Sequence, residues 1–156
     1  MAVAAQLDSN LTVDNCIIED YGRIGLYIRH NTSLYVYDST LIGPTPAYSA
    51  SGELSYGIEV EPAGGACYAV IDGTEIYNHT NTGDPTWSSA AILIDGFDQG
   101  SAGYPDDSTA IITNCDIHDN DYGIYSCNNS LSYAYCNKIY DNYNRGVISA
   151  NNTVND

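Results

Sequence analysis

The hydrophobic residues of this chain fall in short blocks, rich in Ile, Val, Tyr and Thr, that are separated by Asn, Asp or Gly. Short β-branched and aromatic blocks bounded by turn residues are typical of strands, and no stretch keeps the 3.6-residue period of an amphipathic helix. The pattern also repeats, because NCDIHDN at 114–120 returns as CNKIYDN at 136–142. The sequence therefore predicts repeated short strands.

Five units of three blocks each can be aligned on this pattern. The first blocks are 11–13, 34–37, 68–71, 109–112 and 131–135. The second blocks are 15–20, 39–43, 73–78, 114–120 and 136–142, with the register of the second unit uncertain by one residue. The third blocks are 25–28, 57–60, 90–94, 123–126 and 146–149.

Three short strands cannot bury a core alone, but they can form one coil of a solenoid in which each strand pairs with its equivalents about 4.8 Å above and below. We therefore expect an all-β fold, a parallel β-helix of about five coils and one domain over residues 1–156. Three columns follow from the alignment. The inner column is Ile18, Ile42, Ile76, Ile117 and Ile139; a corner column is Cys16, Thr74, Cys115 and Asn137; and Gly25, Gly57, Gly123 and Gly146 mark a corner with positive φ.

Three segments interrupt the repeat, at 43–56, 78–89 and 95–108. They are rich in Gly, Pro, Ser and Asp, as loops are. Insertions into a solenoid tend to gather on its binding face, so we expect all three on the same side and any local function there.

The runs ITNCDIHDNDYGIYSCNNS and AYCNKIYDNYNRGV resemble the right-handed parallel β-helix repeats of the pectate-lyase-like superfamily. Repeats of this type occur in carbohydrate-binding and sugar-hydrolysing proteins and in many archaeal cell-surface proteins. The resemblance is close from residue 109 onward and looser before it. It implies a right-handed helix. It also implies that an active member would use a carboxylate cluster with calcium and an Arg base, or two or three Asp residues for inverting hydrolysis.

Charge narrows the choice of partners. The chain has 20 acidic and 4 basic residues, a net charge of −16. Phosphate backbones and anionic membrane surfaces would be repelled, so nucleic acid and membrane partners are disfavoured. Cations, neutral sugars or further copies of the chain fit better.

The candidate metal ligands are carboxylates that share one exposed strand face in units two and three. Stacked strands would bring them close enough to bind Ca²⁺, the only cofactor that the sequence suggests, or to form an acid and base pair. They are Glu59, Glu61, Asp95 and Asp98. No Arg is placed beside them, since Arg23, Arg29 and Arg145 fall in units one and five. The three His residues, His30, His79 and His118, are expected at the surface or in turns, and no residue is assigned a catalytic role.

Aromatic residues gather in or beside the insertions. Aromatic faces flanked by polar side chains stack on sugar rings, although the same residues could pack loops against one another. The sugar-binding candidates are Tyr48, Tyr56, Trp87, Phe97 and Tyr104.

The cysteines and the glycosylation sequons bear on whether the protein is secreted or displayed at a cell surface. Any pair among Cys67, Cys127 and Cys136 could form a disulfide, with the third left for another chain. Five Asn-x-Ser/Thr sequons would be used only if the protein is secreted or displayed at a cell surface, and the small-residue start MAVAAQ could be the tail of a signal peptide or an added start. The sequons begin at Asn10, Asn31, Asn78, Asn128 and Asn151.

A five-coil β-helix has two open strand layers, and neither end of the sequence carries an amphipathic capping helix. Either the chain is part of a longer protein, or copies stack end to end. We therefore expect an extracellular structural or surface module of a sheath, surface layer, adhesin or filament, without catalytic activity. The alternatives are a carbohydrate-binding module and a fragment of a polysaccharide lyase or hydrolase.

Overall fold

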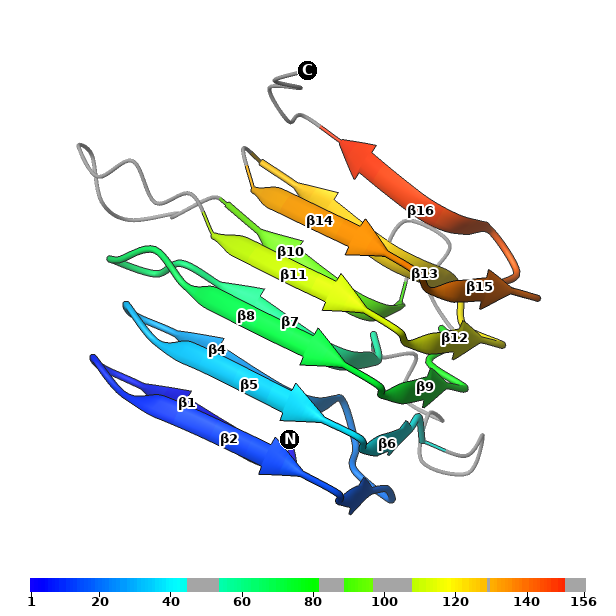
Figure 1. Ribbon diagram of the computed structural model, residues 1–156, viewed down its shortest axis with the longest axis horizontal. Helices are drawn as coiled ribbons and strands as arrows, with labels where there is room; N and C mark the ends of the chain where they lie inside the picture. Colours follow the sequence, from blue (N-terminus) through cyan, green and yellow to red (C-terminus); the bar gives the residue numbers. More distant parts are fainter. Residues whose placement is uncertain (45–53, 82–88, 97–107, 129, 151–156) are drawn as a thin grey trace.

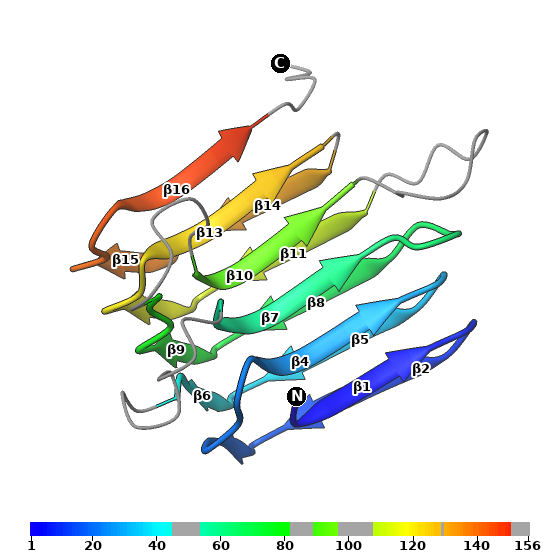
Figure 2. The same ribbon diagram turned by 180° about the vertical axis from the view of Figure 1, so that it is seen from behind.

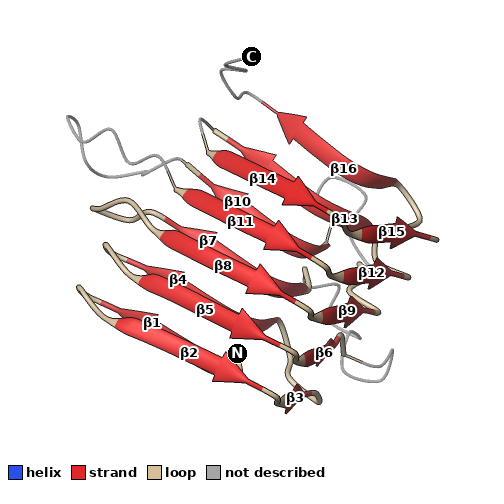
Figure 3. Cartoon of the chain, in the orientation of Figure 1, coloured by secondary structure: helices blue, strands red, loops and turns tan. Residues whose placement is uncertain are grey.

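The computed structural model describes residues 1–44, 54–81, 89–96, 108–128 and 130–150. These residues form sixteen strands and no helix, and the strands make three parallel sheets with short corners between them (Figures 1 and 3). Each sheet takes every third strand, so the chain winds as a coil whose turns lie one above another from β1 to β16. The parallel β-helix predicted from the sequence is confirmed.

Sheet A has six strands and is seen from its own side in Figure 2, whereas sheets B and C have five strands each. Sheet A contains β1 (Val3–Gln6), β4 (Ile24–Arg29), β7 (Tyr56–Glu61), β10 (Ala90–Asp95), β13 (Tyr122–Cys127) and β16 (Arg145–Ala150). Sheet B contains β2 (Asn10–Asp14), β5 (Ser33–Tyr37), β8 (Tyr68–Asp72), β11 (Thr109–Thr113) and β14 (Leu131–Tyr135). Sheet C contains β3 (Ile17–Ile18), β6 (Thr40–Ile42), β9 (Glu75–Tyr77), β12 (Asp116–His118) and β15 (Lys138–Tyr140). Coil one is β2 to β4, and coils two to five follow in threes.

The interior is filled by apolar columns that run through the stack. Sheet C contributes one column in which Ile18, Leu41, Ile76, Ile117 and Ile139 pair in register. The prediction that Ile42 belongs to this column is therefore wrong. Ile42 pairs with Tyr77 and faces outward, and Leu41 takes the inner place. Because side chains alternate between faces, a shift of one residue exchanges the inner and outer positions.

The corner between sheets B and C has the same two-residue form in every coil. The first residue has a positive φ of 44° to 61°, which turns the chain sharply. These first residues are Asn15, Asp38, Gly73, Asn114 and Cys136. The second residues form the predicted column of Cys16, Thr74, Cys115 and Asn137, with Ser39 as its fifth member. Asn137 shows why polar residues suit this column, since its side chain accepts from the Cys115 amide at 2.9 Å and donates to the Ile112 carbonyl at 2.9 Å.

The glycine column lies inside sheet A and not at a corner. Gly25, Gly57, Gly123 and Gly146 occupy one register position with Ala91, and none of these glycines has a positive φ. The predicted reason for them is therefore wrong, and the observed reason is close backbone approach. A Cβ on Gly123 would lie 2.4 Å from the Gly146 carbonyl oxygen and 3.0 Å from Ile139 Cγ2.

Residues within MAVAAQ form β1, which pairs with β4, so this stretch extends the β-helix by one strand. Its expected origin, as the tail of a signal peptide or an added start, stays a prediction. The insertions fall on two different connections: 45–53 and 82–88 come between strands of sheets C and A, whereas 97–107 comes between strands of sheets A and B. These residues lie outside the described part of the chain, so their expected position on one side stays a prediction.

Gly123→Ala should lower the free energy of unfolding by about 1–3 kcal/mol, because the added methyl group overlaps backbone of the next coil. Urea denaturation measures this. Gly22→Ala is the matched control, since a Cβ there meets nothing within 4 Å. Equal stability of the two variants would contradict the close-approach explanation.

Candidate functional site

The outer face of sheet A carries the carboxylates that the sequence singled out. Tyr27, Glu59, Leu93 and Tyr125 form one outward row across β4, β7, β10 and β13. Arg29 pairs with Glu61 in the next row, and Asp95 follows Ile94, which pairs with Val60, so Asp95 lies beside Glu61. The structure thus brings Glu59, Glu61 and Asp95 onto one face, and we call this group the sheet A acidic face.

Glu59 has the most perturbed environment of the three. Burial raises the pKa of Glu59 to about 7; Arg23 opposes this rise, and the nearby charges of Glu61 and Asp95 add to it. Its Oε2 atom is buried and finds no hydrogen-bond partner among the described residues. A carboxyl group half-protonated near neutrality can either donate or accept a proton, and such groups are common at functional sites.

Glu61 is held by two neighbours on β4. The Tyr27 hydroxyl donates to Glu61 Oε2, and the Arg29 Nε atom lies 3.9 Å from the same oxygen. The Arg29 guanidinium also lies over the Tyr27 ring, 5.9 Å from its centroid. Burial, followed by the Glu61 contact, raises the pKa of Tyr27 above its ordinary value. Two side chains of β4 therefore hold the Glu61 carboxyl group in place.

Asp95 is held from the neighbouring corner. The Asn128 Nδ2 atom donates to Asp95 Oδ1 at 2.9 Å. Cys127 pairs with Asp95 across the two strands, and burial, together with the Asp95 charge, raises the pKa of the Cys127 thiol to about 12. This cysteine is accordingly an unreactive thiol.

Within the described residues, no group of three or more His, Cys, Asp and Glu side chains is arranged to hold a metal ion. Asp98, the fourth predicted ligand, lies outside the described residues. Glu59, Glu61 and Asp95 alone therefore do not complete a calcium site, and a Ca²⁺ site that includes Asp98 stays a prediction.

Of the aromatic candidates, only Tyr56 is among the described residues; Tyr48, Trp87, Phe97 and Tyr104 lie outside them. Tyr56 is buried in an apolar cluster on the outer side of sheet A, with Ile24, Ala90 and Leu93, so its ring is not offered to a ligand. The half-buried rings on this face were missed by the sequence reasoning, which searched the insertions only. They are Tyr27, Tyr122 and Tyr125.

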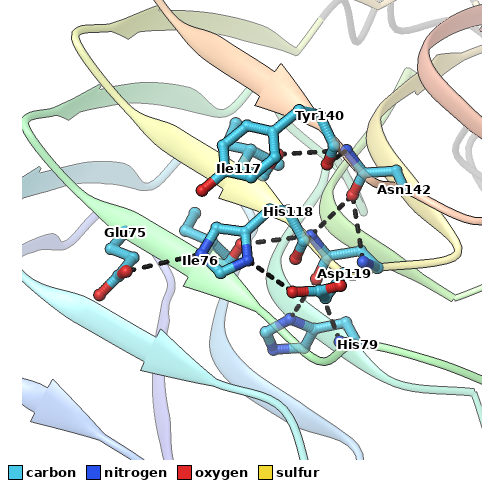
Figure 4. Close-up of polar contacts among 9 residues, drawn as sticks. Glu75, Ile76, His79, Ile117, His118, Asp119, Tyr140 and Asn142 are labelled. Atoms are coloured by element: carbon cyan, nitrogen blue, oxygen red, sulfur yellow. Dashed lines mark hydrogen bonds and ion pairs between the residues drawn. The ribbon is translucent and has the colours of Figure 1, made fainter.

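A second polar group lies at the corner between sheets C and A, where the His79 side chain is fully buried (Figure 4). The expectation that His79 is a surface residue or an ordinary turn residue is therefore corrected. Its Nδ1 atom donates to Asn120 Oδ1 at 2.9 Å, and Asn120 in turn donates to Asn142 Oδ1 at 3.0 Å. Burial lowers the pKa of His79 to about 4, so the imidazole is neutral at neutral pH.

We call His79, Asn120 and Asn142 the polar ladder, and a tyrosine extends it to coil one. At the equivalent position coil two has Pro44, which has no N–H to donate. The Tyr21 hydroxyl of coil one bonds to His79 Nε2 instead. The Tyr21 and His79 rings also stack, with centroids 5.9 Å apart. Because every member is occupied by another member or by backbone, the ladder holds the coils together and is not an open site.

The other two histidines lie elsewhere. His30 follows β4 in a positive-φ turn position, as expected. His118 points outward from β12 and is half-buried between aromatic rings. Among the described residues, neither histidine contacts Glu59, Glu61 or Asp95 of the sheet A acidic face.

No disulfide joins the cysteines of the described part of the chain. Cys127 ends β13 and Cys136 follows β14, so the five-residue strand β14 separates them and rules out a direct bond. Cys67 immediately precedes β8, two strands from β14 in sheet B, which places it about 10 Å from the corner of Cys127. The predicted bridges among Cys67, Cys127 and Cys136 are thus not formed in this structure.

Among the sequons, Asn10, Asn31 and Asn78 are exposed, Asn128 is half-buried and Asn151 lies outside the described residues. Asn31 Nδ2 donates to Asp8 Oδ1 at 2.6 Å, and Asn128 Nδ2 is bound to Asp95. Glycosylation of these residues stays a prediction. The structure describes no helix of the length and hydropathy needed to cross a bilayer.

Glu59→Gln should stabilise the protein at alkaline pH. The unfolded Glu ionises near pH 4.5, whereas the folded Glu59 keeps its proton to about pH 7. Folding stability therefore falls as pH rises between these values, by up to about 1.4 kcal/mol per pH unit, and the loss is complete above them. Gln has no proton to lose, so the variant should exceed the parent by about 1–3 kcal/mol at pH 8.

Urea denaturation of both proteins at pH 5 and pH 8 measures this difference. Glu19→Gln, which changes an exposed carboxylate, is the matched control and should shift stability equally at both pH values. A Glu59→Gln effect that does not depend on pH would contradict the raised pKa.

The comparisons with known proteins agree with the geometry. A family model described as a right-handed beta helix region matches residues 8–156. A search of curated proteins and a search of solved structures each gave no match. Since the matched region covers nearly the whole chain, including all strands from β2 to β16, the chain belongs to the right-handed β-helix family.

Proposed function

We propose that this chain is a structural β-helix module of a secreted or cell-surface protein, which is extended by end-to-end stacking of further copies. The supporting observation is that inward-facing side chains of the first and last described strands of sheet A are partly exposed. Val147 pairs with Ile124 on the inner side of sheet A, yet it is 52% exposed, and Val3 at the other end is 37% exposed. In an isolated module these inward-facing side chains meet water.

The charges of the two ends are complementary. Residues 1–29, which include β1 and coil one, carry four carboxylates and two arginines, a net charge of −2. Residues 131–150, the last coil, carry Lys138, Arg145 and Asp141, a net charge of +1. Opposite charges at the two ends favour head-to-tail contacts, a heterologous arrangement that forms open filaments.

The strand order sets a condition on such stacking. Strands β2 to β16 make five complete coils, and β1 is one additional strand of sheet A. A copy that pairs its β2 with β14 and its β3 with β15 would place its β1 where β16 already lies. Strand β1 of the incoming copy must therefore move aside before the sheets become continuous.

Two variants test the stacking. Removal of residues 1–7 should promote concentration-dependent filaments, whereas Val147→Lys should prevent them, since a charge would enter the joined interior. Sedimentation velocity and electron microscopy report the outcome. Tyr68→Lys, on the middle strand β8, is the control and should assemble as the parent does. Monomers alone in the shortened protein at all concentrations would contradict the proposal.

A second candidate function is carbohydrate binding by the outer face of sheet A. It is favoured by the presence of tyrosine rings beside fixed carboxylate and amide groups: Tyr122 and Tyr125 lie 5.6 Å apart, next to strand β10 with Asp95. Planar rings stack on sugars, and the polar groups hydrogen-bond their hydroxyls. The negative charge of the face favours neutral sugars.

Tyr125→Ala should weaken binding of a soluble neutral polysaccharide, such as xylan or a β-glucan, by about fivefold to tenfold. Calorimetric titration measures the affinity. Tyr35→Ala, which removes a half-buried ring from sheet B, is the control and should leave it unchanged. Release of reducing sugar ends that is lost in Glu59→Gln would instead indicate a hydrolase, since hydrolysis uses one protonated and one ionised carboxyl group.

A further inference from the structure

A column of three rings stands on the outer face of sheet C, outside both surfaces described above. Tyr77 on β9, His118 on β12 and Tyr140 on β15 pair in register. The His118 ring lies 5.1 Å from each tyrosine ring, with interplanar angles of 6° and 14°. The column thus connects coils three, four and five through side chains, in addition to their backbone pairing.

Both ring nitrogens of His118 face carboxylates (Figure 4). Nδ1 lies 2.8 Å from Asp119 Oδ2, and Nε2 lies 3.5 Å from Glu75 Oε1. A neutral imidazole carries a single N–H and can donate to only one of these partners, whereas an imidazolium donates to both. The arrangement is therefore fully satisfied only when His118 is protonated, and the charged ring also interacts favourably with the tyrosine faces.

The surrounding charges act in the same direction. On β12 and its corner lie Asp116 and Asp119, and β9 contributes Glu75. From β15 and its corner come Asp141 and one cation, Lys138, whose Nζ atom is 3.6 Å from Asp116 Oδ2. Burial lowers the pKa of His118, but the hydrogen bonds to Asp119 and Glu75 and the nearby carboxylates outweigh it and leave this pKa raised.

We propose that His118 is a pH-sensitive latch that fastens β15, in coil five, to β9 and β12. When His118 is protonated, two carboxylates and two rings hold the column together. When it loses the proton, one carboxylate contact and the attraction of the charged ring to the tyrosines are lost, and β15 opens more often. Because the folded pKa is raised, the latch is fully closed below about pH 6.5 and is released as pH rises through the folded value.

His118→Tyr provides the test, because it continues the ring column of Tyr77 and Tyr140 without an ionisable imidazole. Amide hydrogen exchange at residues 138–140, corrected for the intrinsic effect of pH, should lose protection by about threefold to tenfold between pH 6 and pH 9 in the parent. Protection in the variant should stay constant. Amides of residues 131–135 on β14, in the same coil, are the internal control, and their protection should not change as His118 titrates.

A second variant keeps the test decisive if His118→Tyr does not fold. Asp119→Asn retains the imidazole and removes one carboxylate, so NMR titration should place its midpoint below that of the parent. The latch is overturned if the parent imidazole titrates at or below pH 6.5, if His118→Tyr keeps the parent's pH dependence at residues 138–140, or if Asp119→Asn leaves the midpoint unchanged.

Discussion

Parallel pairing in register is the constraint on which this structure depends. Each strand pairs with its equivalents in the coils above and below, so every position in the repeat becomes a column of side chains about 4.8 Å apart. A residue must therefore fit equivalent residues on both sides as well as its own environment. Apolar columns such as Leu41, Ile76 and Ile117 satisfy this by packing, and the glycine column satisfies it by leaving room for the neighbouring backbone.

The same constraint explains why many polar residues here are structural. At the corners the backbone bends and leaves amide and carbonyl groups unpaired, and side chains such as Asn120, Asn137 and Asn142 bond to the backbone of the adjacent coil. A buried histidine is tolerated at this corner because Asn120 and Tyr21 occupy both of its ring nitrogens. Outward columns lack this requirement, and there the pKa of Glu59 is raised by burial first and by the nearby charges of Glu61 and Asp95 in addition.

Sequence reasoning found the strands because composition and turn residues mark each block, and the repeat supplies the pairing partners. It failed where the strand register decides which side chain faces inward, and where residues far apart in the sequence form a contact. Leu41 and Ile42 are both apolar, so only the observed register shows which one faces inward. The bond from Tyr21 to His79 passes over the coil that contains Pro44, and no local pattern signals it. Glu59, Glu61 and Asp95 could be placed on one face from the alternation of side chains, but the burial that alters Glu59 could not.

The corners also indicate where a β-helix of this kind can acquire function. The turn between sheets B and C is two residues long in every coil, since its positive-φ residue and the polar residue after it are both fixed by stacking. No such limit applies to the connections on either side of sheet A, where the sequence lengthens at 45–53, 82–88 and 97–107. Sheet A is therefore the one sheet whose described strands are both preceded and followed by lengthened connections in the sequence. Substitutions on the outer face of that sheet, which carries Glu59 and its neighbours, leave in place the inward columns that hold the coils together.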